Sequence, residues 1–228
     1  MQPTQITYWQ NTYCFLSPTR IQSSGKDEKG FFIIPSSTIF YPGGGGQPMD
    51  IGYISSGKDE CKIVGIDFNE GFIKHYLEFA PEELTADQEI TMRIDKENRL
   101  LAASLHTGGH WIAGIVAENL LLPLKPVKGY HYPDSPYVEF EGDRAMVNEE
   151  IIDRINAAIK TESQHDLKIT ATSNLVSNTV MTRRMVTIEN YAAIGCGGTH
   201  VNSTSEIKDT RVTKIFFKNG KIRIGYKV

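Results

Sequence analysis

Short hydrophobic runs separated by turn-forming residues fill the first part of the chain. Residues 30–34, 52–55, 61–66 and 71–77 are rich in Ile, Phe, Val and Tyr, and clusters of Gly, Pro, Ser and Asp divide them. Closely spaced short strands of this kind are typical of a small barrel or sandwich. We predict a β-barrel domain over residues 1–92, followed by a different kind of domain over residues 93–228.

The periodicity becomes helical just after Ile94. Asp95 is a candidate N-cap. Apolar residues then recur at helical spacing: Leu100, Leu101, Leu105, Ile112, Ile115 and Val116. The helix should end before Pro123, and residues 123–136, rich in Pro, Gly and Tyr, are expected to form a loop.

A second helix and several strands are expected further along the chain. Asn148 caps the helix, whose apolar face consists of Ile151, Ile152, Ile155 and Ile159. Residues 137–141, 168–172 and 212–217 alternate like strands, and Asn219-Gly220 is a strong hairpin signal. The predicted fold class is α+β, in which an N-terminal barrel precedes a two-layer α/β domain with an antiparallel sheet.

Composition narrows the class of protein. The 228 residues contain no run of 18 apolar residues, which predicts no membrane span, and the N-terminus lacks the pattern of a secretory signal. Three sparse cysteines suit a reducing cytoplasm better than a disulfide framework. The net charge is -3, yet residues 181–228 carry nine Lys or Arg and three acids. This basic end indicates either a nucleic-acid backbone as partner or a solvated, Lys-rich sheet.

Two short segments far apart in the chain carry metal-ligand residues at a spacing of four. They are His106-Thr-Gly-Gly-His110 and Cys196-Gly-Gly-Thr-His200. Residues i and i+4 share one helix face, and zinc takes imidazole nitrogen and thiolate sulfur at tetrahedral geometry. The four side chains therefore predict a zinc site, either structural or catalytic. His75, His131 and His165 lack partners at this spacing and are expected to be surface or packing residues.

Glycines stand beside the predicted ligands. Gly108 and Gly109 lie inside the predicted helix, where each costs about 1 kcal/mol relative to Ala. They indicate a pocket beside the metal, or, as the alternative, tight packing of the helix. A further run, Phe40-Tyr-Pro-Gly-Gly-Gly-Gly-Gln-Pro48, is neither a Walker loop nor a dinucleotide fingerprint. Its glycines can expose N–H groups to an anion, and the alternative is a flexible turn.

Taken together, these motifs resemble the editing domain of alanyl-tRNA synthetase, and most of all its AlaX-type free-standing relatives. The resemblance includes the glycine run with Gln47, Asp50-x-Gly52, Arg99 and the two metal segments, and it ends at Thr204-x-Glu206-Ile207. The chain length is similar to the medium-length type. The threonyl-tRNA synthetase editing domain shares the metal segments but is less similar in the glycine run.

The resemblance implies a zinc-dependent hydrolase that removes serine, and also glycine, from the acceptor end of tRNA(Ala). It implies that Thr107 contacts the serine hydroxyl, while a back-bond to a helix carbonyl is the alternative. Thr107, Gln47 and Cys196 would be catalytic. Substrate contacts are expected from the glycine run, from Thr107 and from two arginines: Gly43, Gly44, Gly45, Gly46, Gln47, Thr107, Arg183 and Arg184. The family usually has a larger apolar residue between Thr and the second His, where this chain has glycine.

Two rival functions remain open on the sequence. One is a non-catalytic tRNA-binding module with structural zinc, and the other is a zinc hydrolase of small aminoacyl esters. For an editing enzyme, zinc would either activate a water molecule or orient the α-amino group of the substrate. Lys208 and Lys214 join the two arginines as candidate phosphate contacts.

Overall fold

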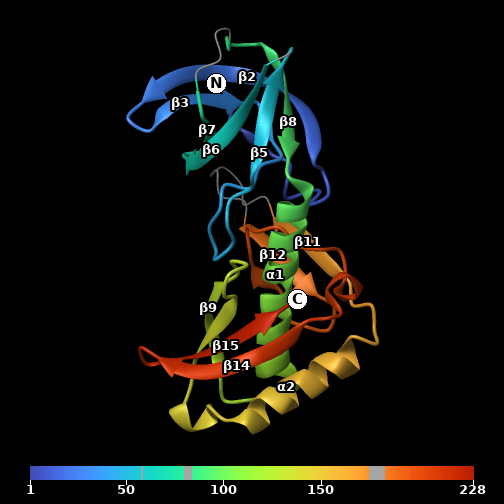
Figure 1. Ribbon diagram of the computed structural model, residues 1–228. Helices are drawn as coiled ribbons and strands as arrows, with labels where there is room; N and C mark the ends of the chain where they lie inside the picture. The colour runs from blue at the N-terminus through green and yellow to red at the C-terminus, as the bar shows by residue number, and fades with distance from the viewer. Residues whose placement is uncertain (58, 80–83, 175–182) are drawn as a thin grey trace. The chain divides into compact units, whose positions relative to one another are not determined.

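The chain forms two compact units, which are described separately (Figure 1). The computed structural model describes residues 1–57, 59–79, 84–174 and 183–228. The first unit holds Met1–Gly44 and Pro48–Leu100, and the second holds Gly45–Gln47 and the described residues from 101 onward. The division falls inside the long helix, and the domain boundary predicted between residues 92 and 93 stays a prediction.

A closed six-stranded barrel makes up most of the first unit, which confirms the predicted barrel. Around the barrel the strands follow the order β2-β3-β7-β6-β5-β8. Their bounds are β2 Leu16–Asp27, β3 Gly30–Pro35, β5 Gly52–Ser56, β6 Asp59–Asn69, β7 Phe72–Leu77 and β8 Glu89–Ile94. Two short strands, β1 Gln5–Ile6 and β4 Ser37–Thr38, pair in parallel beside it.

Two long strands close the barrel by bending. The start of β2 pairs with β8 and its end with β3, and its register shifts between Ile21 and Ser23. Strand β6 likewise pairs first with β5 and then with β7, with a shift between Ile63 and Gly65. Such bulges bend a strand and let a sheet curl on itself. The sequence did not predict β2, because its many polar residues hide the alternation.

Arg99 and Asp50 form a buried ion pair in the first unit. Their side chains are 0% and 1% exposed, and the Nε of Arg99 donates to Asp50 at 2.9 Å. The guanidinium also donates to the carbonyl oxygens of Thr12 and Ile39, and the Asp50 carboxylate accepts from the backbone N–H of Tyr41. A buried charge pair is tolerated when its remaining hydrogen bonds are made, as they are here. These two motif residues therefore hold the fold of the first unit.

His75 lies inside the barrel, which confirms the packing alternative and not the surface alternative of the sequence analysis. Its Nδ1 donates to the carbonyl oxygen of Ile73 at 3.2 Å, and its Nε2 lies 2.9 Å from the hydroxyl of Thr38. The ring of Phe40 packs edge-on against it, with centroids 5.6 Å apart. Burial lowers the pKa of His75 to about 4.

His75 should make the protein less stable in mild acid. The unfolded state binds a proton near pH 6.5, whereas the folded state does so only near pH 4, so stability falls as the pH drops between these values. The cost is about 2 kcal/mol at pH 5. Urea unfolding at pH 7.5 and 5.0 would measure the free energy of unfolding. We expect its loss between these pH values to be about 2 kcal/mol smaller for His75→Gln than for the wild type. Equal pH dependence in the variant and the wild type would contradict this assignment.

The long helix, which belongs to the second unit from Leu101 onward, is buried for most of its length. Helix α1 spans Lys96–Gly114 and continues as a π-helical turn over Ile115–Asn119. Asp95 caps it as predicted, because its carboxylate accepts from the N–H of Asn98 at 3.0 Å. By length and composition alone, Lys96–Asn119 could cross a membrane, but 72% of the apolar window is buried in the fold. Such burial is typical of a core helix.

A four-stranded antiparallel sheet packs against α1. Its order is β14-β15-β10-β9, and in Figure 1 β14 and β15 cross in front of α1. The bounds are β9 Lys125–Tyr130, β10 Tyr137–Glu141, β14 Arg211–Lys218 and β15 Lys221–Lys227. Asn219 and Gly220, both with positive φ (52° and 75°), form the predicted hairpin turn between β14 and β15.

Helix α2 and a smaller sheet complete the second unit. Helix α2 spans Glu149–Glu162, and Asn148 caps it as predicted by accepting from the N–H of Ile151. The side chain of Asn156 bonds both backbone groups of Val212, which ties α2 to β14. The smaller sheet contains β11 Ile169–Asn174, β12 Arg183–Ile188 and β13 Ile194–Gly195. Short 3₁₀ turns lie at Arg144–Met146 and Thr204–Ile207.

The loop predicted for residues 123–136 is wrong in part, because β9 lies within it. Strand β9 pairs antiparallel with β10 and is exposed over its first four residues. As an edge strand rich in Lys, Pro and Gly, it lacks the alternation that marks a half-buried strand. The predicted helices and antiparallel sheet are otherwise confirmed.

Candidate metal centre

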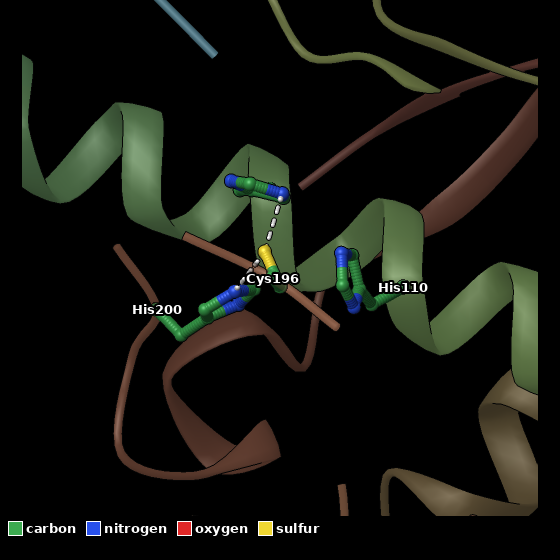
Figure 2. Close-up of side chains that lie close together, drawn as sticks. His110, Cys196 and His200 are labelled. Carbon is green, nitrogen blue, oxygen red and sulfur yellow. Dashed lines mark hydrogen bonds between the residues drawn. The ribbon is translucent and has the colours of Figure 1, made fainter. Parts of the chain in front are cut away.

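The four predicted ligands converge in the second unit. The ligand atoms of His106, His110, Cys196 and His200 all lie within 4.8 Å of one another. Figure 2 shows His110 on α1, with Cys196 and His200 on the chain segments beside it. The two i,i+4 pairs, some ninety residues apart in the sequence, thus meet as the spacing predicted.

Two distances within the cluster match those between ligands of a tetrahedral ion. The Sγ of Cys196 lies 3.4 Å from the Nε2 of His106 and 3.3 Å from the Nε2 of His200. Zinc bonds of about 2.3 Å to sulfur and 2.0 Å to nitrogen would place such atoms about 3.5 Å apart. The donor set, three imidazoles and one thiol, therefore fits a metal ion in both chemistry and spacing.

Gln47 fixes the tautomer of His106. The backbone N–H of Thr199 donates to the Oε1 of Gln47 at 3.0 Å, while the Nε2 of Gln47 donates to the Thr199 hydroxyl at 2.8 Å. Since a backbone N–H can only donate, the orientation of the amide is settled. The Nδ1 of His106, 2.7 Å from Oε1, must then carry the proton. The Nε2 of His106 is left with a lone pair facing Cys196.

Thr107 fixes the tautomer of His200 in the same way. Its hydroxyl donates to the carbonyl oxygen of Ala103 at 2.8 Å and accepts from the N–H of Val201 at 3.2 Å. A hydroxyl has one hydrogen, so the Nδ1 of His200, 3.1 Å away, must donate to it. Thr107 is fully buried. The back-bond that was the alternative for Thr107 is therefore present, and the hydroxyl also orients a ligand.

His131 is the residue of the site that the sequence did not predict. It is 3% exposed and stacks on His106, with ring centroids 4.6 Å apart. Its Nδ1 lies 2.6 Å from the hydroxyl of Tyr226, which itself donates to the carbonyl oxygen of Leu105. No ligand-type residue stands at metal spacing from His131, so the sequence offered no signal for it. The packing interpretation was right, and the surface interpretation was wrong.

Glycines surround the ring of His131 on three sides. A Cβ on Gly109 would lie 2.3 Å from the Cε1 of His131, and one on Gly129 would lie 2.1 Å from its Nε2. A Cβ on Gly46 would meet the carbonyl oxygen of Gly129 at 2.2 Å. Gly108 similarly faces Val228. Tight packing, the alternative for Gly108 and Gly109, is therefore confirmed, and the pocket interpretation is wrong for these two residues.

Arg184 holds the turn that carries Cys196. It is 6% exposed, and its Nη1 donates to the carbonyl oxygens of Cys196 at 3.0 Å and Gly198 at 2.7 Å. These bonds place the guanidinium inside the site, whereas the sequence analysis had expected Arg184 to contact a phosphate of the substrate. The side chain of Arg183 lies outside the part of the chain that the structure describes.

The surroundings keep the imidazoles neutral. Burial, followed by neighbouring imidazoles and Arg184, lowers the pKa of His106 and of His200 well below the usual value. Burial lowers the pKa of His110 to about 4. Burial also raises the pKa of Cys196, against a smaller opposing effect of the Gly198 N–H and Arg184. A metal ligand must be a neutral imidazole or a thiolate, and a bound cation would deprotonate this thiol.

The predicted substrate residues of the glycine run belong to both units. Gly43, Gly44, Gly45 and Gly46 all have positive φ, which only glycine adopts without strain. Gly44 accepts a hydrogen bond from the hydroxyl of Tyr41, and Gly43 faces Met49. Gly46, in the second unit, accepts from the N–H of His131 at 2.8 Å. The predicted contacts of these glycines with substrate stay predictions.

Comparison with known proteins places the chain in a class. A family model described as tRNA synthetases class II (A) matches residues 6–98. A second model, described as the threonyl and alanyl tRNA synthetase second additional domain, matches residues 184–224, which include Cys196 and His200. The segment that carries Cys196 and His200 is thus similar to the second additional domain of these synthetases.

The chain is also similar to individual proteins whose names refer to alanine and its tRNA. The alanine–tRNA ligase of Korarchaeum cryptofilum is 30% identical over 98% of this chain and 26% of the ligase. The mouse alanyl-tRNA editing protein Aarsd1 is 28% identical over 86% of this chain and 50% of that protein. The alanyl-tRNA editing protein AlaX-L of Pyrococcus horikoshii is 26% identical over 94% of this chain and 55% of that protein. The chain is thus similar to an alanine–tRNA ligase and to two alanyl-tRNA editing proteins, and it spans from about a quarter to about half of the length of these relatives.

Proposed function

We propose that this chain edits alanyl-tRNA by hydrolysing the ester that joins a wrong amino acid to tRNA(Ala). The convergence of His106, His110, Cys196 and His200 carries the proposal, because it places a metal-binding set in a chain whose named relatives are alanyl-tRNA editing proteins. Serine and glycine are the proposed amino acids, and the acceptor end of tRNA(Ala) is the proposed partner. The proposed location is the cytoplasm, where charged tRNA is used.

Zinc is the proposed ion. A thiolate and three imidazoles are the ligands that zinc prefers, and they disfavour magnesium and calcium, which take oxygen ligands. When bound, zinc supplies a positive charge that can activate water or polarise an ester carbonyl. Because Cys196 and His110 are only partly buried, they mark the side of the cluster that substrate would reach.

The chain's own residues hold the ligands in one protonation state. Gln47 and Thr107 accept from the Nδ1 of His106 and His200, so both rings present an unprotonated Nε2. Partners of this kind orient metal ligands and raise their basicity. The proposed catalytic set of Cys196, Gln47 and Thr107 thus consists of one ligand and two positioning residues.

Comparing two substrates tests the proposal against its rivals. The wild-type chain with one zinc ion would be given serine-charged tRNA(Ala) and, separately, a seryl ester of adenosine. We expect turnover of the charged tRNA to be faster and to weaken steeply with salt, since phosphate contacts release counterions. Equal, salt-independent turnover of both esters would indicate a hydrolase of small esters. Binding of tRNA without turnover would indicate a non-catalytic module.

A further inference from the structure

One face of the four-stranded sheet β14-β15-β10-β9 points away from the core. On β15, Ile222, Ile224 and Tyr226 are buried, so the alternate residues of the strand point outward. The register extends this face across the sheet, where Phe216 pairs with Arg223 and Lys214 pairs with Gly225. Helices α1 and α2 contribute to the core on the other face. We call this outward side the sheet face.

The sheet face is strongly basic. It carries eight cationic side chains and two acidic ones, a net charge of +6 on a chain of net charge -3. The cations are Lys125, Lys128, Arg211, Lys214, Lys218, Lys221, Arg223 and Lys227. The acids, Glu141 and Glu139, pair with Lys221 and Arg223 at 2.6 and 2.8 Å. Among the described residues, no ion pair neutralises the other six cations.

Three tyrosines stack at one edge of the sheet face. Tyr130 lies between Tyr132 and Tyr137, with ring centroids 4.7 and 5.2 Å apart and interplanar angles of 23° and 15°. The guanidinium of Arg223 lies over the far side of Tyr137, 4.5 Å from its centroid. Tyr132, at the other end of the stack, is 37% exposed. The stack thus leaves an aromatic ring exposed at its end.

The tyrosine stack adjoins the metal centre along the chain. His131 stands between Tyr130 and Tyr132, and its ring stacks on the ligand His106. The buried ring of His131 and the exposed ring of Tyr132 therefore belong to neighbouring residues of one segment. The basic rows then run from the stack across β10, β15 and β14.

We propose that the sheet face binds RNA, with phosphates along the Lys and Arg rows and an unpaired base stacked on Tyr132. This inference rests on the proposed function and names how its RNA partner is held. A net charge of +6 complements a phosphate chain, and exposed aromatic rings on an antiparallel sheet are the way in which proteins stack single-stranded bases. Most of the basic residues of the C-terminal end, for which the sequence left a nucleic-acid partner and a solvated sheet as alternatives, lie on this surface.

Direct binding of uncharged RNA tests the sheet face apart from catalysis. The probe is a fluorescent hairpin copying the acceptor stem of tRNA(Ala) with its single-stranded 3′ end. We expect Lys214→Glu with Lys218→Glu to weaken binding by roughly five- to eightfold per lost contact at 0.1 M salt, and to lower the salt slope by about 0.7–0.9 per contact. The double variant Lys125→Glu with Lys128→Glu, on the edge strand, should weaken binding and lower the salt slope to a similar extent.

Matched variants show whether a loss of RNA binding is due to the sheet face itself. Arg154→Glu with Lys160→Glu applies the same charge change to exposed residues of α2, and it should leave binding nearly unchanged. Tyr132→Ala should weaken binding of the hairpin with the 3′ tail but not of a blunt duplex, and Tyr132→Phe should restore it. Circular dichroism would confirm the fold of each variant.

The outcomes separate this inference from the proposed function. If the wild type binds the hairpin and the sheet-face variants bind it as tightly as the α2 variant does, the sheet face is not the RNA-binding surface. This conclusion holds whether or not the protein hydrolyses the ester. A sheet face that bound only an acidic protein or anionic vesicles would also overturn the inference. Conversely, variants that lose RNA binding but keep hydrolysis of the seryl adenosine ester would support both the sheet face as the RNA-binding surface and the proposed function. Absence of any hydrolysis by the wild type would overturn the proposed function alone.

Discussion

Cys196→Ala is expected to abolish zinc binding and to lower deacylation of serine-charged tRNA(Ala) by at least about 100-fold, since losing only an outer partner of a ligand costs 10–100-fold. Cys196 is the only sulfur ligand of the four, and its Sγ lies within 3.4 Å of the Nε2 atoms of His106 and His200. The measurements are zinc per chain by elemental analysis and the initial rate of serine release. Circular dichroism would show that the fold persists.

Cys14→Ala is the matched control for this variant. Cys14, like Cys196, is a partly buried thiol, but it belongs to the first unit and its Sγ lies 3.5 Å from the backbone carbonyl oxygen of Leu16. The control should keep both zinc and activity. Zinc content and activity of Cys196→Ala equal to those of Cys14→Ala would refute the metal centre. Loss of activity with zinc retained would instead give Cys196 a role other than that of a ligand.

Thr107→Val is expected to weaken zinc binding by about 10–100-fold. The variant removes the acceptor for the Nδ1 of His200 and leaves the ring free to take either tautomer. It also removes the acceptor for the N–H of Val201. Because the effect acts through the metal, hydrolysis of serine and glycine esters should fall by the same factor. Thr107→Ser keeps the hydroxyl and should restore both zinc affinity and activity.

The alternative for Thr107 predicts a different pattern. If its hydroxyl contacted the hydroxyl of the substrate serine, as the family resemblance implies, Thr107→Val would slow only the serine ester. Zinc affinity would then stay unchanged. The structure favours the first pattern, since the single hydrogen of Thr107 is donated to Ala103. Competition with a chromogenic chelator would measure the affinity, and the two esters would be compared at full zinc occupancy.

The ligands could be predicted from the sequence because helix geometry fixes the i,i+4 spacing locally. His106 and His110 needed only a helix, and the motif Cys196-Gly-Gly-Thr-His200 needed only a tight turn. The side chains that hydrogen-bond those candidate ligands could not be predicted from the sequence. Gln47 meets His106 across fifty-nine positions of sequence, and Thr107 meets His200 across ninety-three. Contacts at such separations depend on the tertiary fold, which a periodicity does not encode.

The same limit explains the strands that were missed. Strand β9 carries Lys, Pro and Gly at an exposed edge, and β2 divides its pairing between two neighbours, so neither shows clean alternation. Strands β3 and β7 were predictable, because they are short runs rich in Ile, Phe, Tyr and Leu with turn-forming residues beside them. His131 was assigned to a loop for this reason, although it lies against the candidate ligand His106.

The most direct measurement of the central claim is release of serine from tRNA(Ala) by the wild-type chain, with alanine-charged tRNA(Ala) as the control. Zinc per chain would be measured on the same sample. We predict rapid release of serine, little release of alanine, and loss of serine release on chelation that added zinc restores. No release of serine at full zinc occupancy, or equal release of serine and alanine, would contradict the editing function.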